Sequence, residues 1–430
     1  MVYVINKNGQ PLMPCENVIA RLLLKERKAK VIMRCPFAIK LNYNATEYYR
    51  VLTHAEDTGS GTLGSAVSDE YGNIYYQAEI QVRNDIKPKM DQRRMYRRSR
   101  RGRKTRHRKP RFNNRASSKR KGRLNPTMVS KIEAHEREIR FVSKILPISK
   151  IVFETGQFDP AALKDPSIRS KSKVHWAYQK GIQYGFENLK AAVRSRDGYI
   201  CQKCGKKKGR MEVHHINPRS KGGADIAENL VTVCPDCHEK IHSGKIPNFT
   251  KERDDLARLK DAIQMNVIRS QLLKRYPEAT EVFGYITSAN LTKFGIEKSH
   301  ANDAAVVASN GIKPTFKNDV IYYKRCNSKG DYKKTMGDHS EIRLTTGKLH
   351  GINKYDKVSY FGAVGFVKGK MVGKLNKNGT KGDDYAILMD IDGNKIDFSF
   401  MPKGYKTPKI KNLKRIRGRT SWMTMKRKTA

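Results

Sequence analysis

Residues Cys201–His242, CQKCGKKKGRMEVHHINPRSKGGADIAENLVTVCPDCHEKIH, carry two CxxC pairs, a His-His pair, an Asn and a final CHxxxH. Each CxxC pair can present two thiolates to one tetrahedral Zn²⁺, so the two pairs predict a structural zinc site that clamps the ends of a small insert. The predicted ligands are Cys201, Cys204, Cys234 and Cys237. Between the pairs, VHHI at 213–216 predicts a hairpin strand, and residues 237–242 predict a helix that faces it. The zinc ion does not need the histidines of these elements, so they are free for other chemistry.

This pattern resembles the HNH, or ββα-metal, nuclease module, from VHHI through Asn229 to His238. The resemblance implies that His215 is the general base that deprotonates a water, and that His214 and His238 hold a catalytic Mg²⁺. It also implies that Asn229 fixes the loop and the base. A neutral imidazole can accept a proton at cellular pH, and a divalent cation can stabilise the charge on the phosphorane. The alternative is a zinc ribbon with incidental histidines, but the order of His-His, Asn and Cys-His favours the nuclease.

The charge of the chain indicates a polyanionic partner. The 430 residues carry a formal net charge of +47, and nucleic acid is the usual polyanion for such a protein. No run of eighteen apolar residues is present, and the N-terminus lacks a signal-peptide pattern, so we expect no membrane partner and an intracellular location. Beyond the zinc pairs, Cys15, Cys35 and Cys326 are scattered, as ordinary thiols are in such a location.

The basic charge is concentrated between residues 87 and 123, where nineteen Lys and Arg stand against one acid, Asp91. A helix here would align guanidinium groups with consecutive phosphates, until Gly102 weakens or ends it. The alternative is a disordered basic segment, the usual state of such a charge run. The predicted nucleic-acid contacts are Arg93, Arg94, Arg97, Arg98, Arg101, Arg103 and Arg106.

A second candidate site joins four residues that lie far apart in the sequence: Asp57 in DTGSGTLG, Glu154 in IVFETGQFD, and His300 and Asp303 in HANDA. Taken singly, each acid is an ordinary surface or cap residue. Together they are the oxygen-rich set that a two-Mg²⁺ phosphodiesterase needs. The three motifs resemble the split RuvC nuclease of the RNase H-like fold. That resemblance implies that Asp57, Glu154 and Asp303 bind Mg²⁺ and that His300 is a water-activating or metal-proximal base.

With the PLMP sequence at 11–14, the arginine-rich segment and a β-rich tail, nearly the whole chain resembles the IscB family of transposon-encoded RNA-guided DNA nucleases. The resemblance implies a guide RNA (ωRNA) and a double-stranded DNA target. The HNH site would cut the guide-complementary strand, and the RuvC site the displaced strand. It further implies a monomeric ribonucleoprotein in the bacterial or archaeal cytoplasm, associated with the nucleoid.

The expected fold is α/β and multidomain. It has an RNase H-like (RuvC) mixed sheet that is split in sequence, an inserted zinc-clamped HNH domain, an arginine-rich bridge helix and a β-rich C-terminal domain. The expected ranges are 1–50 (PLMP domain), 51–86, 126–190 and 246–314 (RuvC parts), 87–125 (bridge helix), 191–245 (HNH) and 315–430 (C-terminal domain, which contacts RNA and a target-adjacent motif).

One residue departs from the family pattern. Glu56 stands where the family has an aliphatic residue before the first catalytic Asp, on a strand that is normally buried. Either the strand is more exposed here, or the RuvC site is impaired and the protein nicks DNA. Two other functions remain open on the sequence: a protein-guided HNH endonuclease of homing or restriction type, and a non-catalytic zinc-containing RNA-binding protein.

Overall fold

The computed structural model describes residues 1–46, 48–102, 123–160, 163, 183–207, 209–219, 225–249, 254–327, 350–373 and 382–428. The chain forms two compact units, a larger one of Met1–Gly156 and Gln264–Ala430, and a smaller one of Gln157–Ile263. Two of the predicted nucleic-acid contacts, Arg103 and Arg106, lie outside the described residues, and only the backbone of Arg101 is described. No helix within these ranges is both long and apolar enough to cross a membrane.

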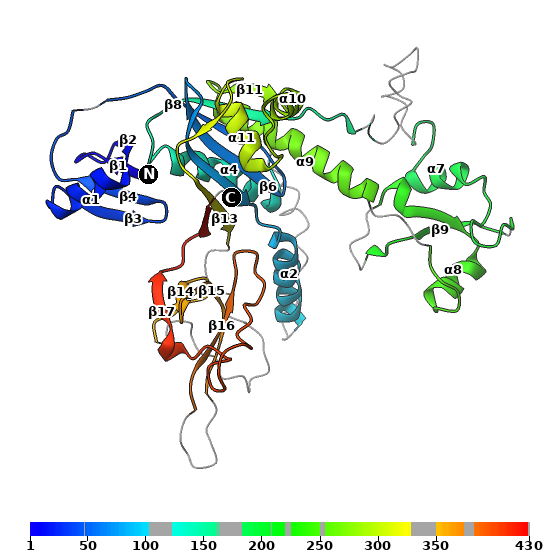
Figure 1. The fold of residues 1–430 in the computed structure, drawn as a ribbon. Coiled ribbons are helices and arrows are strands. Elements are labelled where there is room, and N and C mark those ends of the chain that lie inside the picture. The colour runs from blue at the N-terminus through cyan, green and yellow to red at the C-terminus, as the bar shows by residue number, and fades with distance from the viewer. Residues whose placement is uncertain are drawn as a thin grey trace. The chain divides into compact units, whose positions relative to one another are not determined.

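A mixed eight-stranded sheet is the centre of the larger unit (Figure 1), with the order β11-β8-β5-β6-β7-β13-β18 and with β12 paired to β7. Its strands are β5 (Leu52–Asp57), β6 (Thr62–Asp69), β7 (Asn73–Gln81), β8 (Ile148–Thr155), β11 (Thr280–Phe283), β12 (Thr315–Phe316), β13 (Val320–Cys326) and β18 (Trp422–Lys428). A turn at 71–73 joins β6 to β7, and the Asp69 carboxylate accepts the backbone N–H groups of Tyr71 and Asn73. β5 lies between antiparallel β6 and parallel β8, so two distant chain segments end side by side.

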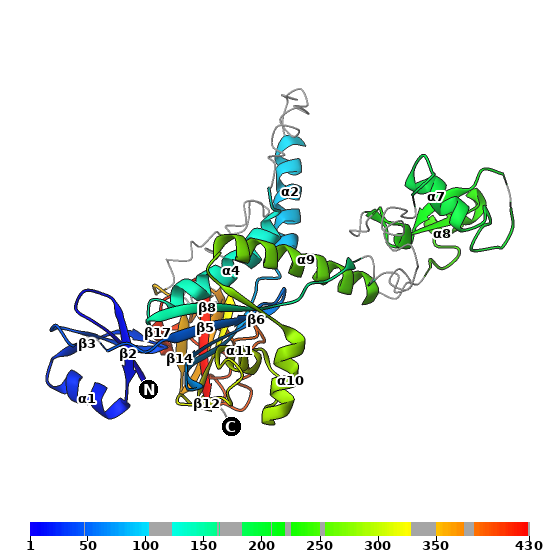
Figure 2. The ribbon, with the colours of Figure 1, turned by 90° about the horizontal axis from the view of Figure 1, so that it is seen from above.

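Helices cover both faces of this sheet (Figure 2). On one face α4 (Pro126–Val142) and the C-terminal half of α9 (Asp254–Arg275) bury a core that includes Ile132, Phe153 and Leu272. On the other face lie α10 (Gly284–Phe294) and α11 (His300–Ala308). β11 ends at Phe283, although the residues that follow are apolar as far as Ile286, and Gly284 begins α10. A short apolar run fits both the helical and the strand periodicity. Hydrogen-bonded pairing with β8 therefore decides where the strand ends.

Two smaller sheets complete the larger unit. The N-terminal sheet, β2-β1-β4-β3, carries α1 (Asn17–Lys25) and consists of β1 (Val2–Ile5), β2 (Pro11–Cys15), β3 (Ala29–Arg34) and β4 (Phe37–Leu41). The C-terminal sheet, β16-β15-β14-β17, consists of β14 (Lys357–Tyr360), β15 (Ala363–Met371), β16 (Tyr385–Met389) and β17 (Lys414–Arg417). β13 and β18 come from the range expected to form a separate C-terminal domain, yet they extend the central sheet.

The basic segment forms α2, which is described over Ile86–Gly102. The side chains of Arg93, Arg94, Arg97 and Arg98 are all exposed along it. Arg94 lies 3.8 Å from Asp91, and both are well exposed, so the pair neutralises little of the charge of the helix.

The smaller unit contains α7 (Leu189–Arg196), a two-stranded sheet of β9 (Glu212–His215) and β10 (Leu230–Val233), and α8 (Pro235–His242). Its core is small, with Met211, Val233 and Ile241 packed around the cysteines. A core of this size needs a further constraint to be stable, and a metal cluster is the usual one.

Candidate active sites

Four cysteine sulfurs meet in the smaller unit. Those of Cys201, Cys204, Cys234 and Cys237 all lie within 4.8 Å of one another, and Cys204 and Cys234 are 3.9 Å apart. Sulfur ligands at about 2.3 Å around a tetrahedral zinc ion lie about 3.8 Å apart, so the spacing fits. Burial opposes ionisation of Cys201, but hydrogen bonds from backbone N–H groups lower its pKa to about 6. Burial and the other three sulfurs raise the pKa of Cys237 to about 12. All four thiols ionise together only when a cation balances them, and thiolates select zinc.

Three imidazoles form a second cluster, between β9 and α8. The ligand nitrogens of His214, His238 and His242 lie within 4.8 Å of one another, and the Nε2 atoms of His238 and His242 are 3.2 Å apart. The buried His214 ring contacts Asn248 through Nε2 at 3.0 Å. Burial, together with the neighbouring imidazoles, lowers the pKa of His214, so this ring is neutral and can offer a lone pair to a metal ion.

His242 is a candidate ligand that sequence reasoning did not assign. The signal was present, because His238 and His242 are four residues apart on a helix and therefore share a face. The three-nitrogen donor set also bears on the metal. Mg²⁺ prefers oxygen ligands, whereas imidazole suits transition-metal dications. The cluster therefore fits a transition-metal dication better than the predicted Mg²⁺. The carboxylate of Glu212 lies 2.6 Å from His238 Nδ1 and orients that ring.

His215 lies outside this cluster, because successive residues of a strand point to opposite faces. Its Nε2 is 2.7 Å from the Asp225 carboxylate, which also accepts two hydrogen bonds from Arg219. Asn229 is buried, and its side chain accepts the Asn217 backbone N–H at 2.8 Å and donates to the Asn217 carbonyl at 3.0 Å. This pair of bonds closes the loop that follows His215.

The acidic site lies at one end of the central sheet of the larger unit. Asp57 is the last residue of β5 and pairs in parallel register with Glu154 of β8. The first turn of α11 brings in His300 and Asp303, and His300 Nδ1 is 2.5 Å from Asp57 Oδ2. Ligand atoms of Asp57, His300 and Asp303 lie within 4.8 Å of one another. The four residues predicted from three distant motifs therefore meet, with Glu154 beside the cluster of three.

Small residues allow α11 to approach the sheet this closely. A Cβ atom at Gly64 of β6 would lie 1.7 Å from the His300 carbonyl oxygen, so only glycine fits there. Below it, Ala55 and Ala66 of the sheet pack against Ala304, Ala305 and Ala308 of the helix. A larger side chain at any of these positions would lift the helix and withdraw both of its site residues.

The electrostatics of this site fit a cation. Burial, with the charges of Asp57 and Asp303 second, raises the pKa of Glu154 to about 8. Burial and Asp57 raise the pKa of Asp303 to about 6. The hydrogen bond to Asp57 raises the pKa of His300. One carboxylate oxygen of Glu154 and one of Asp303 are buried without a hydrogen-bond partner. Crowded carboxylates with unsatisfied oxygens are the donor set of Mg²⁺ or Mn²⁺.

The possibility that Glu56 lies on an exposed strand is wrong. β5 is buried, and Glu56 is fully buried with neither carboxylate oxygen hydrogen-bonded. Its side chain points away from Asp57, to the face on which Lys324 forms an ion pair with Glu138 at 2.7 Å. Burial, with the negative charge of Glu138 second, raises the pKa of Glu56 well above its usual range. The protein therefore keeps this carboxyl group neutral rather than exposing it.

Comparison with known proteins assigns two parts of the chain to protein families. Residues 2–181 match the RRXRR protein family, and residues 201–244 match the HNH endonuclease family. The methyl-directed restriction enzyme EcoKMcrA of Escherichia coli (strain K12) is 38% identical over 65 residues, which are 13% of this chain and 24% of that enzyme. Anaredoxin of Nostoc sp. (strain PCC 7120) is 35% identical over 63 residues, 14% of this chain and 83% of that protein.

Among solved structures, Streptococcus thermophilus Cas9 bound to a GGAA PAM is similar with a TM-score of 0.34 and 15% identity, over 62% of this chain and 32% of Cas9. The same Cas9 with an AGGA PAM gives a TM-score of 0.29 and the same identity. The chain thus spans about a quarter of EcoKMcrA and a third of Cas9. At these scores the Cas9 likeness adds nothing to the assignment, which rests on the two families.

The HNH match covers the residues that form the three-imidazole site, and it supports a DNA endonuclease. The non-catalytic alternative is thereby disfavoured. The RRXRR match and the HNH match follow one another along the chain, and together they support an IscB-like HNH nuclease.

Proposed function

We propose that this protein is an RNA-guided, divalent-metal-dependent DNA endonuclease in which the HNH site cuts the guide-complementary strand and the acidic site cuts the displaced strand. One observation carries the proposal. Two candidate hydrolytic sites with separate donor sets, one of imidazoles and one of carboxylates, occur in two units of one chain. A duplex has two strands of opposite polarity, and two sites in one chain allow one cut in each strand.

In the HNH unit, we assign proton abstraction to His215. When Asp225 accepts the hydrogen bond from Nε2–H, Nδ1 is left with a lone pair that can take a proton from water. Asn229 keeps the loop after His215 closed and so keeps the ring in place. His214, His238 and His242 would hold the cation. When bound, that cation supplies charge stabilisation at the scissile phosphate.

In the larger unit, Asp57, Glu154 and Asp303 would hold Mg²⁺, and His300 would act as the water-activating or metal-proximal base, within an RNase H-like arrangement of the sheet. The positive charge of the cation would stabilise the ionised form of these crowded carboxylates, whose pKa values are raised without it. The contact between His300 and Asp57 orients the imidazole toward the carboxylates. With Nδ1–H donated to Asp57, Nε2 keeps the lone pair that would accept a proton.

RNA guidance is supported by charge and by the family. When base pairing supplies sequence specificity, a protein needs backbone contacts more than base-reading side chains, and a net charge of +47 provides them. The exposed arginines of α2 are placed on one helix that could follow consecutive phosphates as a bridge helix. The partners would be a guide RNA (ωRNA) and a double-stranded DNA target.

The division of labour predicts strand-specific losses. His215→Ala should abolish cutting of the guide-complementary strand only, and Asp57→Ala should abolish cutting of the displaced strand only. The assay uses a duplex labelled differently on its two strands, with the purified protein and its guide RNA. Loss of both cuts in either variant, at unchanged RNA binding, would contradict the assignment.

The similarity to EcoKMcrA favours a second candidate, a protein-guided endonuclease of homing or restriction type. Treating the purified protein with ribonuclease separates the two candidates. Cleavage that survives removal of RNA, and that a new guide sequence does not redirect, would establish the second candidate and refute the first.

A further inference from the structure

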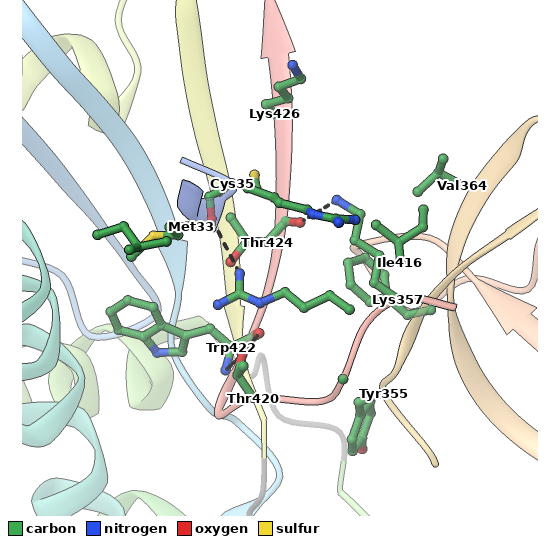
Figure 3. A pocket seen from close by; sticks show the side chains of 15 residues that line it. Met33, Cys35, Tyr355, Lys357, Val364, Ile416, Thr420, Trp422, Thr424 and Lys426 are labelled. Atoms are coloured by element: carbon green, nitrogen blue, oxygen red, sulfur yellow. Dashed lines mark hydrogen bonds between the residues drawn. The ribbon is translucent and has the colours of Figure 1, made fainter. Parts of the chain in front are cut away.

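A pocket of about 390 Å³ lies in the larger unit where all three of its sheets meet (Figure 3). The end of β3 and the following turn, with Met33 and Cys35, form one side, and β14, β15 and β17 form another. β18 contributes Trp422 and Thr424. The volume is within the range of about 300–1,000 Å³ that small-molecule sites occupy, so it has room for one nucleoside but not for a helix.

The charges that line this pocket are all positive. Four cations reach it from four strands, and none of the described lining residues is acidic. They are Arg34, Lys357, Arg417 and Lys426. Within the described ranges none of the four forms an ion pair. Lys357 donates to the Thr424 carbonyl at 2.9 Å and Arg417 donates to the Cys35 carbonyl at 3.3 Å, both neutral acceptors. Burial, and the positive charges of Arg417 and Lys426, lower the pKa of Lys357. The pocket therefore favours an anion.

The remaining lining is apolar and aromatic. Tyr355 and Trp422 contribute half-buried rings, Phe366 contributes a ring that is only 2% exposed, and Ile32 and Val364 are 42% and 37% exposed. A pocket for a bare phosphate or sulfate would not need three rings and uncovered aliphatic side chains. A ligand that carries both a flat apolar group and a negative charge covers this surface and neutralises these cations together. Aromatic faces stack on bases of any sequence, and cations follow the phosphates beside them.

We propose that this pocket takes one unstacked nucleotide of a bound single strand, with its base against the rings and its phosphate among the four cations. The inference rests on the proposed function only in that the partner is a nucleic acid. It places a contact outside both active sites and outside α2. Because the N-terminal sheet, the central sheet and the C-terminal sheet all contribute residues, a nucleotide bound here would also hold these three parts together.

The test measures binding of a fluorescein-labelled twelve-nucleotide single strand, as RNA and as DNA of the same sequence, in buffer without divalent cations. The pocket variant is Arg34→Gln with Lys426→Gln, because both side chains are exposed and their loss should not disturb folding. The matched control is Lys313→Gln with Lys317→Gln, which removes the same charge from exposed positions that do not line the pocket. Equal melting temperatures check that both variants are folded.

We expect the pocket variant to bind about 25-fold more weakly at 0.1 M salt, since each lost phosphate contact on a single strand costs about five-fold there. The slope of log affinity against log salt should fall by about 1.4 in magnitude, while the control changes affinity by about two-fold or less. If the loss occurs with RNA, the nucleotide belongs to the guide, and if it occurs with DNA, it belongs to the target.

Photocrosslinking supplies the second readout. A 5-iodouridine strand should crosslink to a peptide that contains Tyr355, Phe366 or Trp422. Equal weakening of the pocket variant and the control, or crosslinks that avoid all three aromatic residues, would overturn the proposal. Because no cleavage is measured, this failure is separate from failure of the proposed nuclease function.

Discussion

Replacing Glu56 with Gln should stabilise the larger unit, and more so at higher pH. Glu56 is buried with both oxygens unsatisfied, and its pKa is raised well above 4.5, so the folded protein keeps a proton that the unfolded chain releases above about pH 4.5. The stability that this group contributes is therefore greatest at low pH and declines as the pH rises toward the folded pKa. Glutamine has nearly the same shape and carries no such proton.

The magnitude follows from the proton linkage. One proton held only by the folded state lowers the free energy of unfolding by about 1.4 kcal/mol for each pH unit above the unfolded pKa. From pH 5.5 upward the wild type should thus lose up to about 1.4 kcal/mol per pH unit relative to Glu56→Gln, at the full rate while the pH stays below the folded pKa. Other groups with shifted pKa values, such as Glu154, are common to both proteins and cancel in the difference.

Tryptophan fluorescence provides the assay. The chain has two tryptophans, Trp176 and Trp422, and Trp422 packs edge-to-face on Phe141 with its ring 4.6 Å from Lys324. In a Trp176→Phe background, Trp422 reports unfolding of the larger unit in urea. Glu70→Gln is the control, because Glu70 is exposed at the end of β6 and its replacement should change stability by about 0.5 kcal/mol or less at both pH values. A Glu56→Gln protein whose advantage is the same at pH 5.5 and 7.5 would refute the reasoning.

Three further predictions concern the metal sites. Cys201→Ser should release zinc and unfold the smaller unit, while unfolding of the larger unit, reported by Trp422, is unchanged. Metal analysis and urea unfolding measure these effects, with Cys15→Ser as the control. Retention of one zinc per chain would contradict the prediction. Mn²⁺ binding at the acidic site should tighten from pH 6 to 8, by up to about ten-fold per unit for each proton displaced, because the pKa of Glu154 is about 8 and carboxylates bind metal only when ionised. Calorimetry measures this, and an affinity independent of pH excludes it. His242→Ala should weaken Mn²⁺ binding to the HNH unit at least about ten-fold and slow cutting of the complementary strand, whereas His350→Ala, outside the cluster, should not; equal behaviour of the two variants removes His242 from the ligand set.

Local patterns predicted much of this molecule. The CxxC spacing identified the four sulfurs that meet, and HANDA identified the first turn of α11. The arginine-rich segment is helical over Ile86–Gly102. These features depend on residues close in sequence, whose geometry one turn or one helix defines. His242 was also within reach, because its spacing from His238 is local.

Other features depend on pairing between distant segments. No local pattern shows that β13 and β18 leave the C-terminal sheet to extend the central one, because edge strands of either sheet have the same alternation. The burial and protonation of Glu56 could not be predicted from local sequence either. Its surroundings include Glu138 and Lys324, which lie 82 and 268 positions further along the chain. The pocket at the meeting of three sheets has no sequence signature at all.

The sequence by itself determined the donor atoms: four thiolates, a set of imidazoles and three carboxylates in three motifs, with an excess of positive charge that requires a polyanion. Only the tertiary structure decided which of them share a site and in which protonation state. Parallel pairing of β5 with β8, and the close approach of α11 at Gly64, place Asp57, Glu154 and Asp303 together. Burial then raises all three pKa values, and the charges of neighbouring carboxylates add to the rise at Glu154 and Asp303. Ligand identity is a property of side chains, whereas proximity and desolvation exist only after distant segments have packed.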